Sequence, residues 1–184
     1  MIFEETGLAG ALLIEPERMA DSRGFFARTF CARDFAERGL ASVFVQSSVS
    51  FNLRAGTLRG MHFQMPPHRE VKLVRCTAGA IWDAIVDLRT GSPTRLRWFG
   101  SELSAENRRM LYIPEGFAHG FITLQPNSEV FYEMTEFFAP QAARGLRWND
   151  PAFAIAWPKE PQVIAERDAS YPDLDLRALA EVGS

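Results

Sequence analysis

Short β-prone segments, each closed by a turn residue, dominate this sequence and restrict the folds that it can adopt. Eleven prolines and thirteen glycines interrupt its 184 residues, so few stretches are long enough for a regular helix. Several of the segments between them alternate apolar and polar residues, which is typical of strands with one buried face. We predict strands at Val43–Val49, Lys72–Cys76, Ala80–Leu88, Met110–Ile113, Gly120–Leu124 and Val130–Met134.

Helical patterns are few. One covers Ala32–Arg38 and is closed by Gly39, and a second is expected at about Asp173–Val182. Many short strands with regular turns and few helices predict an all-β fold, either a sandwich or a barrel, with a few short peripheral helices. The chain length suits one domain, and no internal repeat or linker divides it.

The charge balance argues against two classes of partner. Lys and Arg number 20 against 23 Asp and Glu, a net charge of -3, which gives no general attraction to nucleic acid or to an anionic membrane. The two cysteines are too few for a disulfide framework and lack metal-site spacing. No apolar run approaches the length of a membrane span. We therefore expect a cytoplasmic protein without a nucleic-acid or membrane partner.

The densest group of chemically active residues lies in the segment LRGMHFQMPPHREVK, which begins at Leu58. Arg59 and His62 flank a Gly-Met pair on a predicted strand and Lys72 opens the next strand, so the three side chains could converge on one concavity. A neutral imidazole can remove a carbon-bound proton near neutral pH, and the two cations could stabilise the resulting oxyanion. From composition alone, a hydrogen-bonded structural role for His62 is favoured over a catalytic one.

A second motif lies in the segment LYIPEGFAHGF. It contains the pattern Pro-x-Gly-x-x-His as Pro114, Gly116 and His119. Together with the segment around His62 it resembles the paired motifs of the cupin superfamily, whose fold is a small jelly-roll β-barrel. The resemblance implies that both histidines lie on strands of one barrel.

The metal-binding version of the first cupin motif has a second histidine two residues after His62, where this chain has Gln64. An amide is a poor ligand for the metals that cupins bind, so we expect no catalytic metal and no other cofactor. Glu70 stands near the position of the usual carboxylate ligand. A metal site made of His62, His119 and Glu70 is the alternative.

Ten motifs in one order extend the resemblance over nearly the whole chain, from Asp21 to Pro172. They are DSRGFFARTF, FVQSSVS, LRGMHFQ, KLVRC, GAIWDAIVDLR, GSPT, ELSAENRRMLYIPEGFAHGF, EVFYEMTEFF, LRWNDPAFAIAWP and AERDASYP. This order resembles the dTDP-4-dehydrorhamnose 3,5-epimerase family. The resemblance implies a single cupin domain over residues 1–184, with a core at about 20–158 and a functional C-terminal segment at 159–184. It also implies a homodimer.

The same resemblance implies a set of proton-transfer residues. His62 would be the base, paired with Asp168 from the C-terminal segment, because a carboxylate fixes the tautomer of an imidazole. Lys72 would belong to a cradle for the enolate, and Tyr132 would be the acid on the opposite face. The expected reaction epimerises a nucleotide-linked 4-keto-6-deoxy sugar at C3 and C5, converting dTDP-4-dehydro-6-deoxy-D-glucose to dTDP-4-dehydro-L-rhamnose for rhamnose biosynthesis.

Further residues match positions that hold the nucleotide and its diphosphate in the family. They are Arg23, Phe26, Gln46, Arg59 and His119. Three other expected substrate contacts depart from the family pattern, with Arg28 in place of a frequent Glu, Ser48 in place of Asn and Phe138 in place of Tyr. These departures weaken the inference to thymidine and to one particular sugar.

Four alternative functions therefore stay open at the level of sequence. The nearest is a C3-only epimerase acting on another nucleoside diphosphate 4-keto-6-deoxy sugar. A sugar-nucleotide ketoisomerase would carry two histidines separated by one residue, which Gln64 contradicts. A metal-dependent cupin oxygenase would need the ligand set that is incomplete here. A non-catalytic sugar-binding cupin would have no use for a base, an orienting carboxylate and an acid together.

Overall fold

The computed structural model describes residues 1–175 of the chain. Its strands are β1 (Ile2–Glu5), β2 (Leu12–Glu15), β3 (Arg18–Asp21), β4 (Gly24–Ala27), β5 (Gln46–Asn52), β6 (Thr57–Gln64), β7 (Lys72–Ala78), β8 (Ala80–Asp87), β9 (Trp98–Ser104), β10 (Met110–Ile113), β11 (Phe117–Thr123), β12 (Ser128–Met134), β13 (Ala143–Gly145) and β14 (Val163–Ile164). The helices are α1 (Ala32–Ala36) and α2 (Glu166–Ala169).

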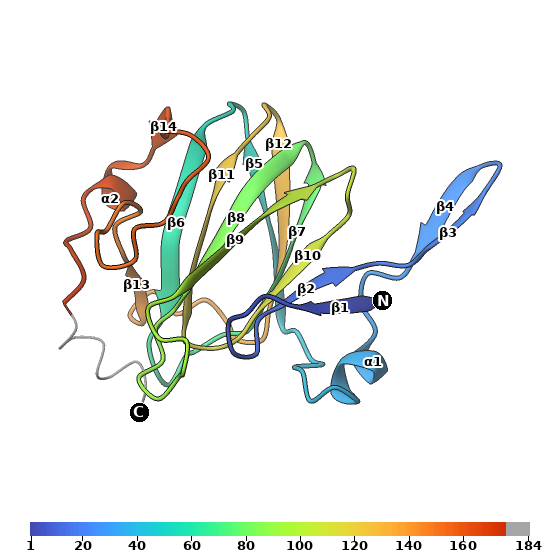
Figure 1. Ribbon diagram of the computed structural model, residues 1–184, viewed down its shortest axis with the longest axis horizontal. Helices are drawn as coiled ribbons and strands as arrows, with labels where there is room; N and C mark the ends of the chain where they lie inside the picture. The colour runs from blue at the N-terminus through green and yellow to red at the C-terminus, as the bar shows by residue number, and fades with distance from the viewer. Residues whose placement is uncertain (176–184) are drawn as a thin grey trace.

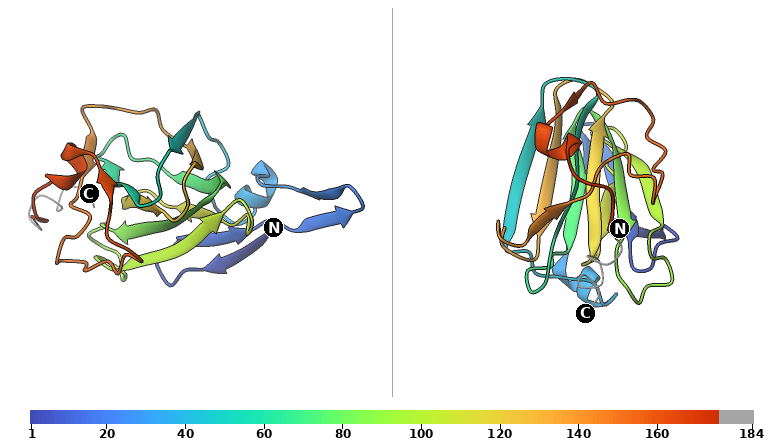
Figure 2. Two further views of the ribbon diagram at one scale, coloured as in Figure 1. Left: turned by 90° about the horizontal axis from the view of Figure 1, so that it is seen from above. Right: turned by 90° about the vertical axis from the view of Figure 1, so that its left-hand side faces the viewer.

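Two sheets face each other and form the body of the molecule (Figures 1 and 2). The first sheet has the strand order β1-β2-β10-β7-β12-β5, and the second has the order β13-β6-β11-β8-β9 with β14 beside β6. All pairings are antiparallel except that of β14 with β6. The expected all-β, two-sheet barrel is confirmed. Strands β3 and β4 pair only with each other and project as a hairpin from the end of the body opposite α2 (Figure 1).

The second sheet is buried on both faces. Toward the first sheet, Ile81, Ile85 and Phe121 pack in a core between the layers. On the outer face, side chains such as Val86 pack under the segment at residues 146–157. Burial on both faces explains why six of the eight residues of β8 are apolar. Packing on both faces also holds β6, β8 and β11 rigidly, so these strands can keep functional side chains in fixed positions.

The predicted strands are present as β5, β6, β7, β8, β10, β11 and β12, apart from some boundaries, whereas β1 to β4, β9, β13 and β14 were not predicted. Strand β10 has the predicted bounds, and β11 begins earlier, at Phe117, so that His119 is a strand residue. Strand β5 begins at Gln46 rather than at the predicted Val43 and runs on to Asn52. The reason is that its partner β12 ends opposite Gln46, which leaves the residues before it without a strand to pair with.

The predicted early helix is present as α1, although it ends at Ala36 before a turn at Gly39, whose φ of 69° suits glycine. The second predicted helix, at about Asp173–Val182, lies largely outside the described residues, and residues 173–175 are not helical. Within the described chain, no helix has the length and apolar character needed to cross a membrane.

A bulge in β6 sets the directions of the functional side chains. Against β11, His62 is opposite His119 and Arg59 is opposite Phe121, so three steps on β6 match two on β11. In a regular strand, residues three apart face opposite sides. The extra residue lets Arg59 and His62 line the same cavity. Gly60 makes this possible with a φ of 138°.

Gly60 should therefore tolerate no side chain. An added Cβ would lie 2.5 Å from Cα of Gly120, and its φ is one that L-residues rarely adopt. We expect Gly60→Ala to lower the free energy of unfolding by about 1–3 kcal/mol from backbone strain, with the clash adding to it. Urea denaturation measures the loss. Gly91→Ala is the matched control because its Cβ would meet nothing within 4 Å, and equal stability of the two variants would contradict this account of the bulge.

Candidate active site

Two adjoining cavities open between the sheets, with volumes of about 480 Å³ and about 780 Å³. The first cavity is walled by strands of both sheets and by the segment at residues 163–168. The second lies toward the start of β5 and residues 138–144. His62, Lys72, Tyr132 and Arg167 line both cavities. The four shared residues mark the junction of the cavities as the chemical centre of the site.

His62 and Asp168 meet at this junction. Nε2 of His62 lies 2.8 Å from Oδ1 of Asp168, and the backbone N–H of Gly60 donates to Oδ2 at 3.2 Å. Asp168 is only 3% exposed. Its burial would raise its pKa, but the hydrogen bonds from His62 and Gly60 outweigh that effect and keep the pKa below its usual value. An ionised carboxylate only accepts hydrogen bonds, so Nε2 carries the proton and Nδ1 has the free lone pair of the neutral ring.

The position of Asp168 follows from the way the C-terminal segment attaches to β6. Strand β14 pairs in parallel with the start of β6, placing Val163 opposite Thr57 and Ile164 opposite Leu58. The short helix α2 follows directly and carries Asp168 toward the bulge. In Figure 1, β14 and α2 lie against the β6 edge of the body. The pairing of β14 with β6 thus brings the carboxylate to the imidazole, although the two residues are 106 positions apart in the sequence.

Tyr132 and Lys72 lie on neighbouring strands of the opposite sheet. Burial raises the pKa of Tyr132 far above its usual value, so its phenol holds its proton at neutral pH. Burial likewise lowers the pKa of Lys72, and the charge of Glu70, which is in contact with the ammonium group, partly opposes this effect. The site thus places a protonated phenol and a cation across from an imidazole.

His119 lies deeper in the first cavity and pairs with Asp83 on β8. Its Nε2 is 2.8 Å from Oδ1 of Asp83, and the two side chains are 6% and 0% exposed. Burial raises the pKa of Asp83, while the neighbouring imidazole acts in the opposite direction. The ring of His119 also contacts Tyr132 edge-on, at 6.1 Å between centroids. Arg59 lines the same cavity, and its Nε donates to Oδ1 of Asn52 at 2.8 Å.

Three of the expected nucleotide contacts, Gln46, Ser48 and Phe138, line the second cavity. Oε1 of Gln46 accepts the backbone N–H of Phe138 at 2.9 Å, which joins the end of the sheet to the loop after β12. The Phe138 side chain is 62% exposed. An exposed ring at the mouth of a cavity offers a flat apolar surface for a base or another ring.

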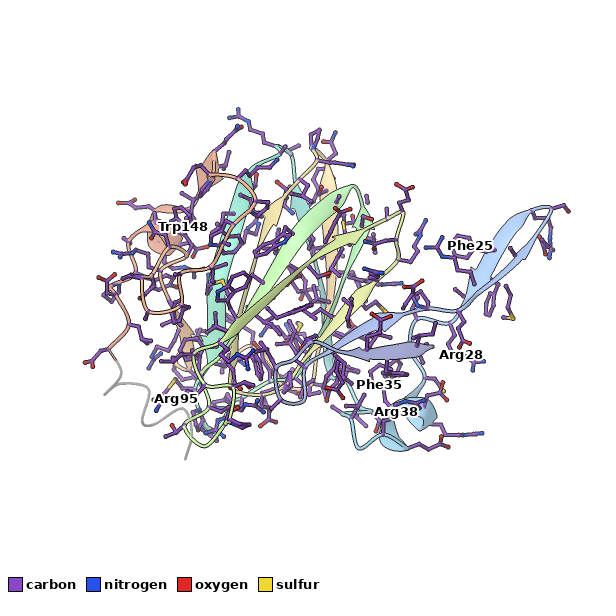
Figure 3. All side chains as sticks on the ribbon, in the orientation of Figure 1. Phe25, Arg28, Phe35, Arg38, Arg95 and Trp148 are labelled. Carbon is purple, nitrogen blue, oxygen red and sulfur yellow. The ribbon has the colours of Figure 1, made fainter. Side chains whose placement is uncertain are left out.

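The remaining three, Arg23, Phe26 and Arg28, lie away from both cavities. Arg23 stands at the tip of the hairpin in an ion pair with Asp21, and Phe26 is 63% exposed. Figure 3 shows Phe25 and Arg28 at the projecting end of the molecule, while Trp148 lies at the other end. Within one chain these residues line neither of the cavities in which the predicted proton-transfer residues lie.

Among the cavity-lining residues that sequence reasoning missed, two lie beside His62. Arg167 lies with Nη2 3.4 Å from Nε2 of His62 and with Nε 3.3 Å from Asp168. Tyr171 packs its ring edge-on against His62, at 6.4 Å between centroids, and lines the second cavity. Both flank Asp168 in the AERDASYP motif. Their closeness in sequence to a proposed catalytic carboxylate is the signal that would have identified them.

Gln64, which occupies the position of a metal-binding histidine in other cupins, connects two loops by hydrogen bonds. Its amide nitrogen donates to the carbonyl groups of His68 and Phe137 at 2.9 and 3.3 Å, and its oxygen accepts the N–H of Ala139 at 2.6 Å. The side chain is therefore fully used in fastening two loops together. One of these loops carries Phe138, so Gln64 supports the mouth of the second cavity.

The other positions of the cupin metal motifs also have partners within the protein. His62 and His119 each pair with a carboxylate, and Glu70 contacts Lys72. No group of three or more His, Cys, Asp or Glu side chains in the described part of the chain is arranged to hold a metal ion. The side chains present do not fit the metal that many cupins carry.

Comparisons with known proteins agree with the geometry. The family model described as dTDP-4-dehydrorhamnose 3,5-epimerase matches residues 5–175. The dTDP-4-dehydrorhamnose 3,5-epimerase of Methanothermobacter thermautotrophicus is 45% identical over 175 residues, which cover 94% of each chain. The crystal structure of dTDP-4-dehydrorhamnose 3,5-epimerase from Bacillus anthracis, with TDP and PPi bound, matches with a TM-score of 0.90 and 42% identity, covering 94% of this chain and 99% of that one.

A second kind of relative is ChmJ, a 3'-monoepimerase from Streptomyces bikiniensis solved in complex with dTDP-quinovose. It matches with a TM-score of 0.85 and 29% identity, covering 97% of this chain and 88% of that chain. These likenesses define the class of protein: an isomerase of 4-keto-6-deoxy sugars built on the cupin barrel. Within that class, the chain belongs to the dTDP-4-dehydrorhamnose 3,5-epimerase family.

Proposed function

We propose that the protein inverts both C3 and C5 of dTDP-4-dehydro-6-deoxy-D-glucose and so forms dTDP-4-dehydro-L-rhamnose. The observation that carries the proposal is the contact of His62 with Asp168 at the junction of the two cavities, opposite Tyr132 and Lys72. The protons on C3 and C5 are both α to the C4 ketone. Removal of either one gives an enolate on the same oxygen, so one base and one oxyanion site can serve both centres.

In the proposed mechanism, Nδ1 of His62 removes the proton while Nε2–H donates to Asp168. The carboxylate stabilises the imidazolium that forms. Lys72 and Arg59 line the first cavity from opposite sheets and stabilise the enolate oxygen, an effect worth roughly 2.7–4 kcal/mol per well-aimed donor. Tyr132 delivers a proton to the opposite face of the carbon, which inverts the stereocentre. A phenol kept protonated by burial suits this task.

The catalytic cycle needs no metal, because the four motif positions are already occupied by other interactions. The partners of these side chains therefore disfavour an oxygenase or a metal-dependent isomerase. The similarity to a 3'-monoepimerase keeps inversion of C3 alone as the second candidate. It differs from the first only in whether the sugar presents C5 to His62 after C3.

Turnover of dTDP-4-dehydro-6-deoxy-D-glucose in D₂O distinguishes the candidates. We expect deuterium at both C3 and C5 in the proton NMR spectrum, faster at C3, with a product of L configuration. A chelator should leave the rates unchanged. Incorporation at C3 alone after long incubation would replace the proposal with a C3 epimerase. No incorporation at either carbon, with a substrate shown to bind, would refute the enolate mechanism.

In the same assay, His62→Ala should lose about 10²–10⁴-fold in turnover, the usual contribution of a positioned general base. His68→Ala is the matched control, because His68 lies in a loop and pairs with Glu136 instead of lining either of these cavities. Similar activity of the two variants would show that another group is the base.

We further propose that the protein acts as a homodimer in which the β3–β4 hairpin of one copy completes the nucleotide site of the other. The hairpin carries Arg23 and Phe26, projects from the body (Figure 1) and lines neither cavity of its own chain. It exposes Met19 and Phe25 as well as Phe26. The exposed apolar side chains of this projecting hairpin would be buried if the hairpin packed against a second copy of the chain.

Complementation tests this arrangement. His62→Ala and the double variant Arg23→Ala/Phe26→Ala should each be weakly active alone, since each lacks part of every site. When they are refolded together, random pairing should restore about a quarter of the wild-type sites, because half of the dimers contain one intact site of two. No recovery, with mixed dimers demonstrated by a tag, would mean that the hairpin serves its own chain or none.

A further inference from the structure

Glu70 and Lys72 form an ion pair in the wall of the second cavity. Their side chains are only 12% and 13% exposed, so the pair is largely removed from water. The attraction between two opposite charges is much stronger in a low-dielectric wall than on a surface, and the geometry of the pair is correspondingly well defined. Neither the proton-transfer set nor the nucleotide contacts described above include Glu70.

The backbone holds these two residues in place. Residues two apart in an extended chain face the same side, so Glu70 and Lys72 point into the cavity while Val71 points into the apolar cluster beside α1. The N–H of Val71 donates to Oγ1 of Thr135 at 2.9 Å, and its carbonyl accepts the N–H of Thr135 at 3.1 Å. The carboxylate is therefore carried on a fixed segment at the start of β7.

The charges around Lys72 explain why an anion is needed there. The first cavity brings Arg59 from β6 and Arg167 from α2 to the same space, together with His62, His119 and Tyr132. Arg144 and Tyr171 line the second cavity together with the lysine.

Of the carboxylates that line the cavities, Asp168 is directed to His62. That leaves Glu70 as the partner that contacts Lys72. Burial lowers the pKa of Lys72 and the charge of Glu70 opposes that effect, so without Glu70 the ammonium group would lose its proton more readily.

We propose that Glu70 is a positioning residue that fixes the Lys72 ammonium group at the point where the enolate oxygen forms. The inference rests on the proposed function, in which Lys72 stabilises that oxygen. Glu70 occupies the place near which metal-binding cupins carry their carboxylate ligand. In this protein the carboxylate holds the cation of a side chain instead of a metal ion.

The composition of the chain allows a direct measurement. Lys72 and Lys159 are the only lysines in the sequence. Protein labelled with ¹³C-lysine therefore gives two ε-carbon signals, whose shifts report protonation, and Lys159→Arg assigns them. The titration requires no substrate. It compares the wild type with Glu70→Gln, with Glu70→Asp and with Glu166→Gln, which removes an exposed carboxylate from α2 that lines neither cavity.

In Glu70→Gln the titration midpoint of Lys72 should fall by about one pH unit or more, because a partner of opposite charge at contact distance has been removed. The Lys159 signal should not move, and Glu166→Gln should change neither signal. Turnover should show a lower kcat with little change in KM, and the alkaline limb of kcat should move to lower pH, since the ammonium form is lost earlier.

An unchanged Lys72 midpoint in a natively folded Glu70→Gln variant would overturn the proposal. If that variant does not fold, Glu70→Asp, which draws the carboxylate back by one methylene, should give a smaller downward shift, and no shift would overturn the proposal equally. A wild-type protein that fails to enolise any 4-keto sugar would instead refute the proposed function, while the lysine titration would still report on the pairing.

Discussion

The contact between His62 and Asp168 is the interaction on which the rest of the site depends. It joins residues 106 positions apart at a distance of 2.8 Å. Three features make it possible: the bulge in β6 that turns His62 inward, the pairing of β14 with β6, and the short helix that follows. The two-sided burial of the second sheet makes β6 stiff enough to hold the imidazole in one orientation.

The interior of the barrel is built from polar pairs rather than from isolated groups. His119 pairs with Asp83, Arg59 donates to Asn52 and Lys72 contacts Glu70. A buried charge without a partner would be costly, and a pair holds both of its members in defined positions. Charge that develops on a substrate would therefore meet groups that are already oriented, which is the condition for electrostatic catalysis in a site of low dielectric constant. The free energy needed to orient these groups is supplied when the protein folds.

The fold and part of the site follow from the sequence, and the rest depends on long-range packing. Alternating and apolar runs predicted the central strands β5, β7, β8, β10, β11 and β12 to within a few residues, but not β1 to β4, β9, β13 and β14. The observed β5 begins later than predicted because β12 ends opposite Gln46. Local spacing predicted that Lys72, on the strand after that of His62, would converge with it on one cavity, which the structure confirms, although the two strands lie in opposite sheets. The approach of Asp168 was expected only through the family resemblance, because no local pattern encodes a strand pairing across that separation. The bulge at Gly60 and the roles of Arg167 and Tyr171 likewise depend on contacts between distant segments.

The tautomer of His62 is the most direct test of the central contact. The chain has three histidines, so ¹⁵N-histidine spectra give three sets of ring signals that single substitutions can assign. In the neutral ring of the free protein, the proton should reside on Nε2, because the ionised Asp168 can only accept a hydrogen bond. Asp168→Ala should abolish that preference. A wild-type spectrum with the proton on Nδ1 of His62, or a tautomer unaffected by Asp168→Ala, would contradict the pairing and the direction of proton transfer derived from it.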